Sequence, residues 1–170
     1  NGQLGQNDVT ARSTPTQVGV YSWNAIGCGT SFTAAVRADG ALFTWGINTN
    51  GQLGDGTTVQ RSSPVQVGYS SWATVSCSVC HTMALRSDRT AWGWGSNVNG
   101  PLGTNSTTNA SSPVQIGTLS WNQVIAFKAS TSSAGIRSDG TLYTWGFNSQ
   151  GQLGTNDVIS RSSPTQITTN

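Results

Sequence analysis

The chain is built from one unit that recurs about every 50 residues. Trp23, Trp72 and Trp121 follow one another at intervals of 49 residues. Four related segments recur in step with them: Asn1-Gly-Gln-Leu-Gly5, Asn50-Gly-Gln-Leu-Gly54, Asn99-Gly-Pro-Leu-Gly103 and Gln150-Gly-Gln-Leu-Gly154. A fixed period of this length is typical of architectures in which each unit packs against the next. The period therefore constrains the fold class more than any local pattern does.

The composition argues against helices. Charged residues make up 8% of the chain, with one lysine and no glutamate, whereas helix surfaces are usually rich in Glu and Lys. The 21 glycines and 7 tryptophans favour short strands joined by tight turns. The net charge of +2 comes from scattered arginines, so no nucleic acid partner is expected. No apolar run approaches the ~20 residues of a membrane span.

The unit that begins at Tyr69 shows the expected strands most clearly. Alternating or apolar runs predict strands at 71–75, 81–85 and 90–94, and a short outer strand at 113–116 that begins with a proline. A long polar loop, residues 95–112, precedes the last of them. Four short strands per repeat describe the blade of a β-propeller. The sequence thus predicts an all-β fold of four-stranded antiparallel sheets.

The period divides the chain into three full blades and part of another. The predicted units are a partial blade with an outer strand and loop at 1–19, and blades at 20–68, 69–117 and 118–170. Three such blades do not close a ring. The chain is therefore a piece of a larger ring of about seven blades, an assembly of several copies, or an open arc with exposed apolar ends. We favour the piece of a larger ring, because both ends fall inside a repeat.

Two copies depart from the period. The turn between the second and third strands contains Asp39-Gly40 and Asp139-Gly140, but Asp88-Arg89 in the middle unit. Arg89 is expected to cost about 1 kcal/mol if the backbone is the same, because glycine adopts positive φ without strain. The third unit also carries a two-residue insert within 127–133, where a loop surface can be specialised.

Several segments resemble a known repeat family. Trp45-Gly-Ile-Asn-Thr-Asn-Gly-Gln-Leu-Gly54, Trp145-Gly-Phe-Asn-Ser-Gln-Gly-Gln-Leu-Gly154 and His81-Thr-Met-Ala-Leu85 are similar to the regulator of chromosome condensation repeat. The Arg-Ser-Ser-Pro segments resemble the bacterial and phage versions of this repeat, often described as similar to alpha-tubulin suppressor, more than the eukaryotic nuclear one. The resemblance implies a β-propeller, usually of seven blades, but no activity. The nuclear member is a guanine-nucleotide exchange factor that uses a protruding wedge, and this sequence shows no counterpart of that wedge.

The segment Cys77-Ser-Val-Cys80-His81 has the pattern of a haem c attachment site. We interpret it as structural, because His81 is the strand histidine of the repeat and Cys77 occupies the place of Cys28 one unit earlier. These side chains offer at most three metal ligands on different strand faces, so neither cofactor nor metal is expected. A Cys28–Cys77 disulfide is an alternative to buried free thiols.

The sequence gives no support for catalysis. His81 is the only histidine, and the six acidic residues are aspartates that lie mostly in turns. Asp39, Asp88 and Asp139 recur once per blade, which favours a role in turn structure over general acid–base chemistry. The chain is therefore predicted not to be an enzyme.

We predict a non-enzymatic scaffold for protein–protein or surface contacts. A polar, lysine-poor surface favours a secreted, cell-surface or virion setting. The candidate binding loops are 20–22, 27–31, 78–80 and 127–133, and the residues proposed for contact are Ser78, Val79, Phe127, Lys128, Ser130 and Thr131. The expected partners are an unidentified protein and further blades from the same chain or another copy. The alternative is a regulatory propeller, an exchange factor or chromatin-associated module, which a basic face and a wedge would support.

Overall fold

The computed structural model describes residues 1–128 and 130–168. These residues form twelve β-strands and no helix. The strands are β1 (Trp23–Cys28), β2 (Phe32–Arg37), β3 (Leu42–Gly46), β4 (Arg61–Gln66), β5 (Trp72–Cys77), β6 (His81–Arg86), β7 (Ala91–Gly95), β8 (Ala110–Gln115), β9 (Trp121–Ala126), β10 (Ser132–Arg137), β11 (Leu142–Gly146) and β12 (Arg161–Gln166).

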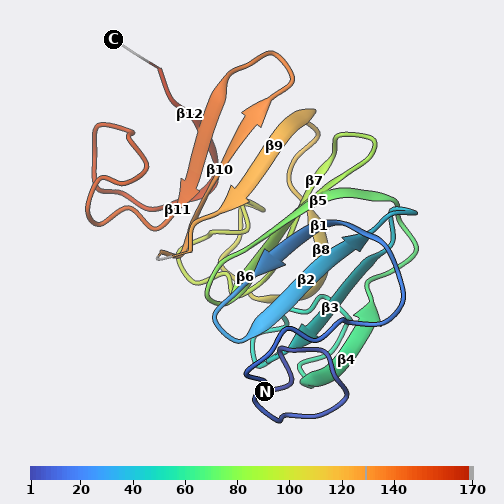
Figure 1. Ribbon diagram of the computed structural model, residues 1–170. Helices are drawn as coiled ribbons and strands as arrows, with labels where there is room; N and C mark the ends of the chain where they lie inside the picture. The colour runs from blue at the N-terminus through green and yellow to red at the C-terminus, as the bar shows by residue number, and fades with distance from the viewer. Residues whose placement is uncertain (129, 169–170) are drawn as a thin grey trace.

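Each run of four consecutive strands forms one antiparallel sheet, as expected for a propeller blade. The sheet orders are β1-β2-β3-β4, β5-β6-β7-β8 and β12-β11-β10-β9, and Figure 1 shows the three blades following one another along the chain. The predicted all-β class and blade architecture are confirmed. We call the three sheets blade 1, blade 2 and blade 3.

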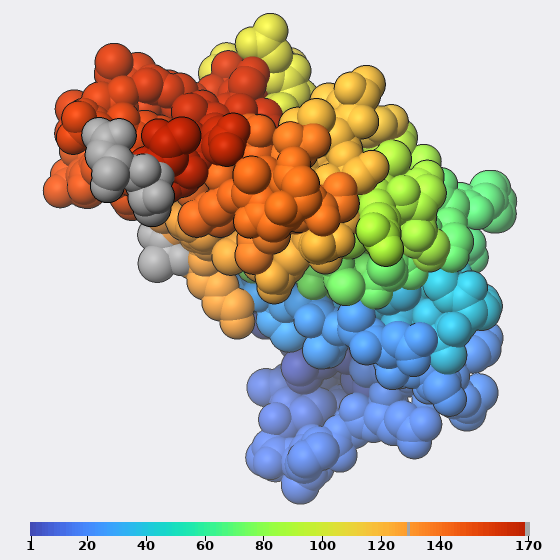
Figure 2. Space-filling view, turned by 90° about the horizontal axis from the view of Figure 1, so that it is seen from above, coloured from blue at the N-terminus to red at the C-terminus, as the bar shows by residue number. Residues whose placement is uncertain are grey.

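The blades form an open arc. The first strand of each blade lies on its inner side, because β5 contacts β1 and β2 of blade 1, and β9 contacts β5 and β6 of blade 2. The segments near the two ends of the chain lie at opposite ends of the molecule in the space-filling view (Figure 2). The described residues therefore do not close a ring.

The predicted strands of blade 2 match the structure except at the outer strand. β8 begins at Ala110, three residues before the proline that we expected to start it. Its pairing with β7 shifts register between Gly93 and Gly95. Pro113 lies opposite this irregular stretch, where its missing N–H is tolerated on an outer strand. The expected start at Pro113 was wrong because an edge bulge accommodates a proline inside the strand.

The apolar core lies between the blades. Trp72 of β5 packs on Trp94 of β7 with ring centroids 5.7 Å apart. Both belong to a buried cluster that also contains Phe32, Val36 and Leu42 of blade 1. Full burial of such a side chain contributes about 1.5–3 kcal/mol. Each blade therefore depends on its neighbour for stability, as in other repeat proteins.

A polar joint repeats at each blade boundary. The loop between the third and fourth strands reaches the next blade, where the carbonyl of Gln52 accepts hydrogen bonds from Trp94 Nε1 (3.0 Å) and Thr82 Oγ1 (2.8 Å). The carbonyl of Pro101 accepts equivalent bonds from Trp145 Nε1 and Ser133 Oγ (2.8 and 2.9 Å). The N-terminal segment makes the same joint to blade 1, through Gln3, Trp45 and Thr33.

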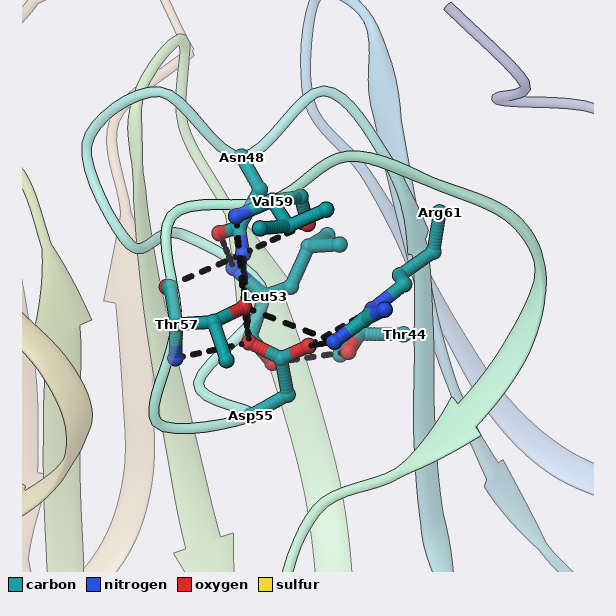
Figure 3. A network of polar contacts seen from close by, with 7 residues as sticks. All are labelled: Thr44, Asn48, Leu53, Asp55, Thr57, Val59 and Arg61. Carbon is teal, nitrogen blue, oxygen red and sulfur yellow. Dashed lines mark hydrogen bonds and ion pairs between the residues drawn. The ribbon is translucent and has the colours of Figure 1, made fainter.

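One buried asparagine organises each of these loops. In blade 1, Asn48 Nδ2 donates to the carbonyls of Thr57 and Val59, both at 3.0 Å, and Asn48 Oδ1 accepts from the backbone N–H of Leu53 at 2.9 Å (Figure 3). The same arrangement recurs around Asn97 and Asn148.

An ion pair supports two of the three loops. Arg61 Nε donates to Asp55 at 2.8 Å in blade 1, and Arg161 pairs with Asp157 in blade 3. Burial acts to raise the pKa of Asp55, but hydrogen bonds from Thr57 and Arg61 outweigh it and leave the pKa below its usual value. The loop of blade 2 has Ala110 at the position of the arginine, so Asn97 acts there without an ion pair.

Replacing Arg89 with glycine is expected to stabilise the protein by about 1 kcal/mol. Arg89 has a φ of 67°, in the same region as Gly40 at 88° and Gly140 at 87°, so the expected departure at this turn keeps the glycine backbone. Urea unfolding measures the gain. The Arg89→Ala variant removes the charge but keeps the strain, so it should show no comparable gain; equal effects of the two substitutions would contradict the strain explanation.

Candidate interaction surface

The turns between the first and second strands of the three blades lie side by side. Residues 29–31, 78–80 and 127–131 form these turns, and we call them the turn strip; residue 129 lies outside the described residues. A Cβ atom at Gly29 would lie 2.6 Å from the carbonyl oxygen of Ser78. Ser78 Oγ in turn donates to the carbonyl of Ser130 at 3.4 Å. The strip is therefore continuous across the three blades.

The turn strip is anchored by the long loops. The backbone N–H groups of Ile47, Ser96 and Phe147, at the start of these loops, donate to the carbonyls of Ser31, Cys80 and Thr131. The blade 3 turn has five residues where blade 2 has three, since β9 ends at Ala126 and β10 begins at Ser132. The expected insert therefore enlarges this turn.

The side chains proposed for contact differ in exposure. Lys128 is exposed and Val79 is 40% exposed, whereas Ser78 is buried. Phe127, Ser130 and Thr131 are half-buried. Ser78 is therefore covered by the strip, while the other residues present a mixed polar and apolar surface with one positive charge, on Lys128.

The fourth candidate loop, 20–22, lies elsewhere. The carbonyl of Ser22 accepts a hydrogen bond from Ala38 N–H at 2.9 Å, which places this loop beside the hairpins at the other end of β1. We call residues 38–41, 87–90 and 138–141 the hairpin rim. The structure thus brings three of the four predicted loops together and separates the remaining one.

The hairpin rim explains the recurring aspartates and arginines. Asp39 Oδ1 accepts from the backbone N–H of Ala41 at 3.1 Å, and Asp88 and Asp139 make the same turn contact. Hydrogen bonding, first from Arg37 and then from Ala41, lowers the pKa of Asp39 to about 2. These are turn residues, as the sequence indicates.

Arginine stacking on aromatic rings was missed by the sequence analysis. The guanidinium carbon of Arg86 lies 3.6 Å from the centroid of a Trp92 ring, and Arg37 lies over Phe43 and Arg137 over Tyr143. A signal was present, because the three arginines and the three aromatic residues both follow the repeat period. Such contacts hold the side chains flat against the blades.

The Cys77–His81 segment does not converge on one point. Cys77 is buried against blade 1, where a Cβ atom at Gly27 would lie 3.0 Å from its sulfur. His81 is buried toward blade 3, and its Nε2 lies 3.0 Å from Ser133 Oγ. Cys80 is half-buried. The three side chains therefore lie in different surroundings: Cys77 packs on blade 1, His81 contacts blade 3 and Cys80 is partly exposed. Among the described residues, no three His, Cys, Asp or Glu side chains gather as metal ligands.

All three cysteines are free thiols. The alternative of a Cys28–Cys77 disulfide is therefore not realised, and the expectation that the thiols are buried was wrong for Cys28, which is exposed. Its counterpart Cys77 is covered by blade 1, whereas no described blade precedes Cys28. Burial raises the pKa of the Cys77 thiol to about 12.

Thiol labelling is expected to follow this order of exposure. In dilute native protein, Cys28 should react first with a thiol reagent, Cys80 more slowly and Cys77 only on unfolding. Burial limits access of the reagent, and it also raises the pKa of Cys77 and Cys80, which disfavours the reactive thiolate. Mass spectrometry of the labelled peptides measures each rate. Labelling of Cys77 as fast as Cys28 would contradict the packing of β5 against blade 1.

The described part of the chain contains no helix with the length and apolar character that crossing a membrane requires.

The turn strip, the inter-blade joints and the hairpin rim together define a repeat scaffold of propeller blades. The sequence matches the family model "Regulator of chromosome condensation (RCC1) repeat" at residues 39–85, 90–134 and 139–170. A second model of this repeat matches residues 20–52 and 72–100. The chain therefore belongs to the RCC1 repeat family.

Solved structures show the same fold at low sequence identity. Human WBSCR16 is 22% identical, with a TM-score of 0.81 over 98% of this chain and 45% of that one. Yeast RCC1 (Prp20), solved with Kap60, is 19% identical, with a TM-score of 0.81 over 100% of this chain and 44% of that one. Prp20p from Saccharomyces cerevisiae, described with its binding to Gsp1p and histones, is 18% identical, with a TM-score of 0.76 over 85% and 38%. No curated protein sequence matches the chain.

This chain spans less than half the length of these structures. The TM-scores show a shared fold, and at identities of 18–22% the likeness shows no more than that. One fold can serve many functions, so the function has to be argued from the surface of this chain.

Proposed function

We propose that the protein is a non-enzymatic scaffold that binds a protein partner through the turn strip. The continuity of the strip carries this proposal: Gly29 meets Ser78 and Ser78 meets Ser130, so turns 49 residues or more apart form one surface. Rigid elements that position variable turns are a common basis of binding sites. The enlarged blade 3 turn adds the only lysine of the chain to that surface.

The character of the strip favours a protein partner. Its exposed part combines an apolar side chain, Val79, with one cation, Lys128, and neutral polar groups. Such a mixture suits a protein surface better than a polyanion, which needs clustered basic residues. The described binding of Prp20p to Gsp1p and histones supports a protein as the class of partner. We further propose a secreted, cell-surface or virion setting, in line with the lysine-poor surface.

We also propose the division into a partial blade at 1–19 and blades at 20–68, 69–117 and 118–170, each cut in the turn between an outer strand and the next inner strand. This division makes each full unit one sheet with its own long loop, and it places one turn of the turn strip in each of the three blades.

Photocrosslinking tests the site. A photoreactive side chain at Val79 or Lys128 should give an adduct with the partner, whereas the same group at Arg89 or Ser138 on the hairpin rim should not. The two rims lie at opposite ends of the strands, so the rim positions are matched controls on the same blades. Adducts formed mainly from the hairpin rim would overturn the proposal.

A further inference from the structure

The side-chain charges of the chain balance everywhere except at two places. Five arginine–aspartate pairs form among the described residues. The charged side chains outside these pairs are Arg86, Asp88, Arg89 and Lys128. Lys128 lies on the turn strip, and the other three lie at the hairpin of blade 2. The net charge of +2 is therefore divided between the turn strip and this hairpin, which belongs to the blade that packs between blades 1 and 3.

Arg86 is held by a tryptophan instead of by an aspartate. The equivalent arginines of blades 1 and 3 each pair with the aspartate two residues later, whereas the guanidinium carbon of Arg86 lies 3.6 Å from the centroid of a Trp92 ring. Thr90 Oγ1 accepts a hydrogen bond from Trp92 Nε1 at 2.9 Å and donates one to Asp88 at 2.6 Å, which holds both the ring and the carboxylate in place. Arg86 Nε is buried without a hydrogen-bond partner among the described residues. Arg86 is thus a fixed cation that no carboxylate pairs with directly.

Arg89 brings a second guanidinium to the same hairpin at a cost to the backbone. It has a φ of 67°, at the position that glycine occupies in the hairpins of blades 1 and 3. This conformation is strained for a residue with a Cβ atom, and residues kept under such strain are concentrated at functional sites. The side chain of Arg89 is exposed and forms no ion pair among the described residues. The contacts of the fold therefore do not account for an arginine at this position.

The two arginines belong to one tight turn. The backbone N–H of Arg89 donates to the carbonyl of Arg86 at 3.0 Å, and the Cα atoms at the two ends of such a turn are less than about 7 Å apart. Both guanidinium groups can therefore reach one ligand. The segment before β5 is joined to this turn by a hydrogen bond between the hydroxyl groups of Ser71 and Ser87 at 3.0 Å, and it carries Tyr69, which is fully exposed. We call Tyr69, Arg86 and Arg89 the arginine site.

We propose that the arginine site binds the carboxylates of an acidic peptide segment in a partner protein. A guanidinium group holds a carboxylate through two parallel hydrogen bonds. One excess positive charge suits one or two carboxylates, whereas a nucleic acid needs a larger cluster of basic residues. Small molecules bind in concave pockets, but Arg89 and Tyr69 are exposed. Arginine and tyrosine are also the residue types enriched where proteins meet.

The arginine site is separate from the turn strip. In blade 2 the turn at 78–80 and the hairpin at 87–90 lie at opposite ends of β6, so the two surfaces can bind independently. A photoreactive group at Arg89 replaces the guanidinium itself, so no adduct is expected from that position even where the partner carries an acidic segment.

A labelled acidic peptide tests the binding. Fluorescence anisotropy of fluorescein-labelled tetraglutamate, titrated with the intact chain up to about 1 mM, should show saturable binding at an ionic strength of about 20 mM. Binding should weaken at about 150 mM, because salt screens exposed charges. Tetraglutamine with the same label should not bind, since it has the same length without the side-chain carboxylates. Inorganic phosphate at the concentration of the peptide should not displace it.

The variant Arg89→Gly separates binding from folding. It relieves the backbone strain, so it should be at least as stable in urea as the intact chain, yet bind tetraglutamate at least ~10-fold more weakly. Arg86→Lys keeps the charge but lacks the planar fork, and should also bind more weakly. Arg12→Gln is the matched control, because it removes one positive charge from an exposed arginine elsewhere; its affinity should stay within about 2-fold of the intact chain. Lys128→Gln, on the turn strip, should also keep the affinity.

Equal binding of tetraglutamate and tetraglutamine, or no binding of either, would overturn the recognition of carboxylates. An unchanged affinity in Arg89→Gly would remove this hairpin as the site, and an equal loss in Arg12→Gln would reduce the effect to net charge. Displacement of the peptide by an equal concentration of inorganic phosphate would overturn a peptide as the ligand and leave a site for free anions.

Discussion

Replacing Asn97 with alanine should lower the free energy of unfolding by about 3 kcal/mol, because one change removes several buried hydrogen bonds. Asn97 Nδ2 donates to the carbonyls of Ser106 (2.9 Å) and Thr108 (3.1 Å), and its Oδ1 accepts from Leu102 N–H at 3.0 Å. Asn97 is completely buried. Alanine leaves two carbonyls and one N–H without these partners, in a loop that has no arginine–aspartate pair to support it.

Urea unfolding measures this loss, and two further variants sharpen it. Asn122→Ala changes an exposed asparagine on β9 and should stay within about 0.5 kcal/mol of the unaltered protein. Asn97→Asp keeps an acceptor for Leu102 but aims a carboxylate at two carbonyls, so it should cost at least as much as alanine. If Asn97→Ala matched Asn122→Ala, the amide would not organise the loop.

The repeat period predicted most of the fold because every blade uses the same local chemistry. Tryptophans at equal spacing lie at equivalent positions, and even Arg89 adopts the backbone of the glycines it replaces. The period could not predict burial. Ile26 and Val75 are chemically alike and occupy the same strand position, yet only Val75 is covered. Burial depends on whether a neighbouring blade is present, and that information is not local.

The turn strip was predicted in its parts and not in its arrangement. Equivalent turns lie on one rim because every blade has the same orientation, so the grouping of 78–80 with 127–133 follows from the repeat. The loop at 20–22 precedes β1 and the turn at 29–31 follows it, so this loop lies beside the hairpin rim at the opposite end of the strand. The contact of His81 with Ser133 crosses 52 residues. The sequence carried a hint of this contact, because Ser133 occupies the repeat position of Thr33 and Thr82. The hydroxyl groups of these two threonines donate hydrogen bonds to the carbonyls of Gln3 and Gln52.

The His81 contact predicts how stability depends on pH. Ser133 Oγ donates its one hydrogen to the carbonyl of Pro101 at 2.9 Å, so it must accept from His81 Nε2–H. The neutral ring therefore carries its proton on Nε2, and Nδ1 is buried without a hydrogen-bond partner among the described residues. Protonation would place a charge and a second N–H in this apolar site. Burial accordingly lowers the pKa of His81 from 6.5 to about 4.

Stability should therefore fall by about 3 kcal/mol as the pH is lowered from 7 to 4. Between the two pKa values the unfolded chain binds a proton that the folded chain does not, so the stabilisation is complete above pH 6.5 and lost toward pH 4. The aspartates with lowered pKa values lose their stabilisation only as the unfolded chain begins to protonate its carboxyls, below about pH 5. The interval from pH 7 to 5 therefore reports on His81. Urea unfolding at several pH values measures the slope. His81→Gln has no titrating group at this site and should show a nearly flat profile from pH 7 to about 5, even if it is less stable at pH 7. A slope that survives there in His81→Gln would assign the pH dependence to another group and remove the buried neutral histidine as its cause.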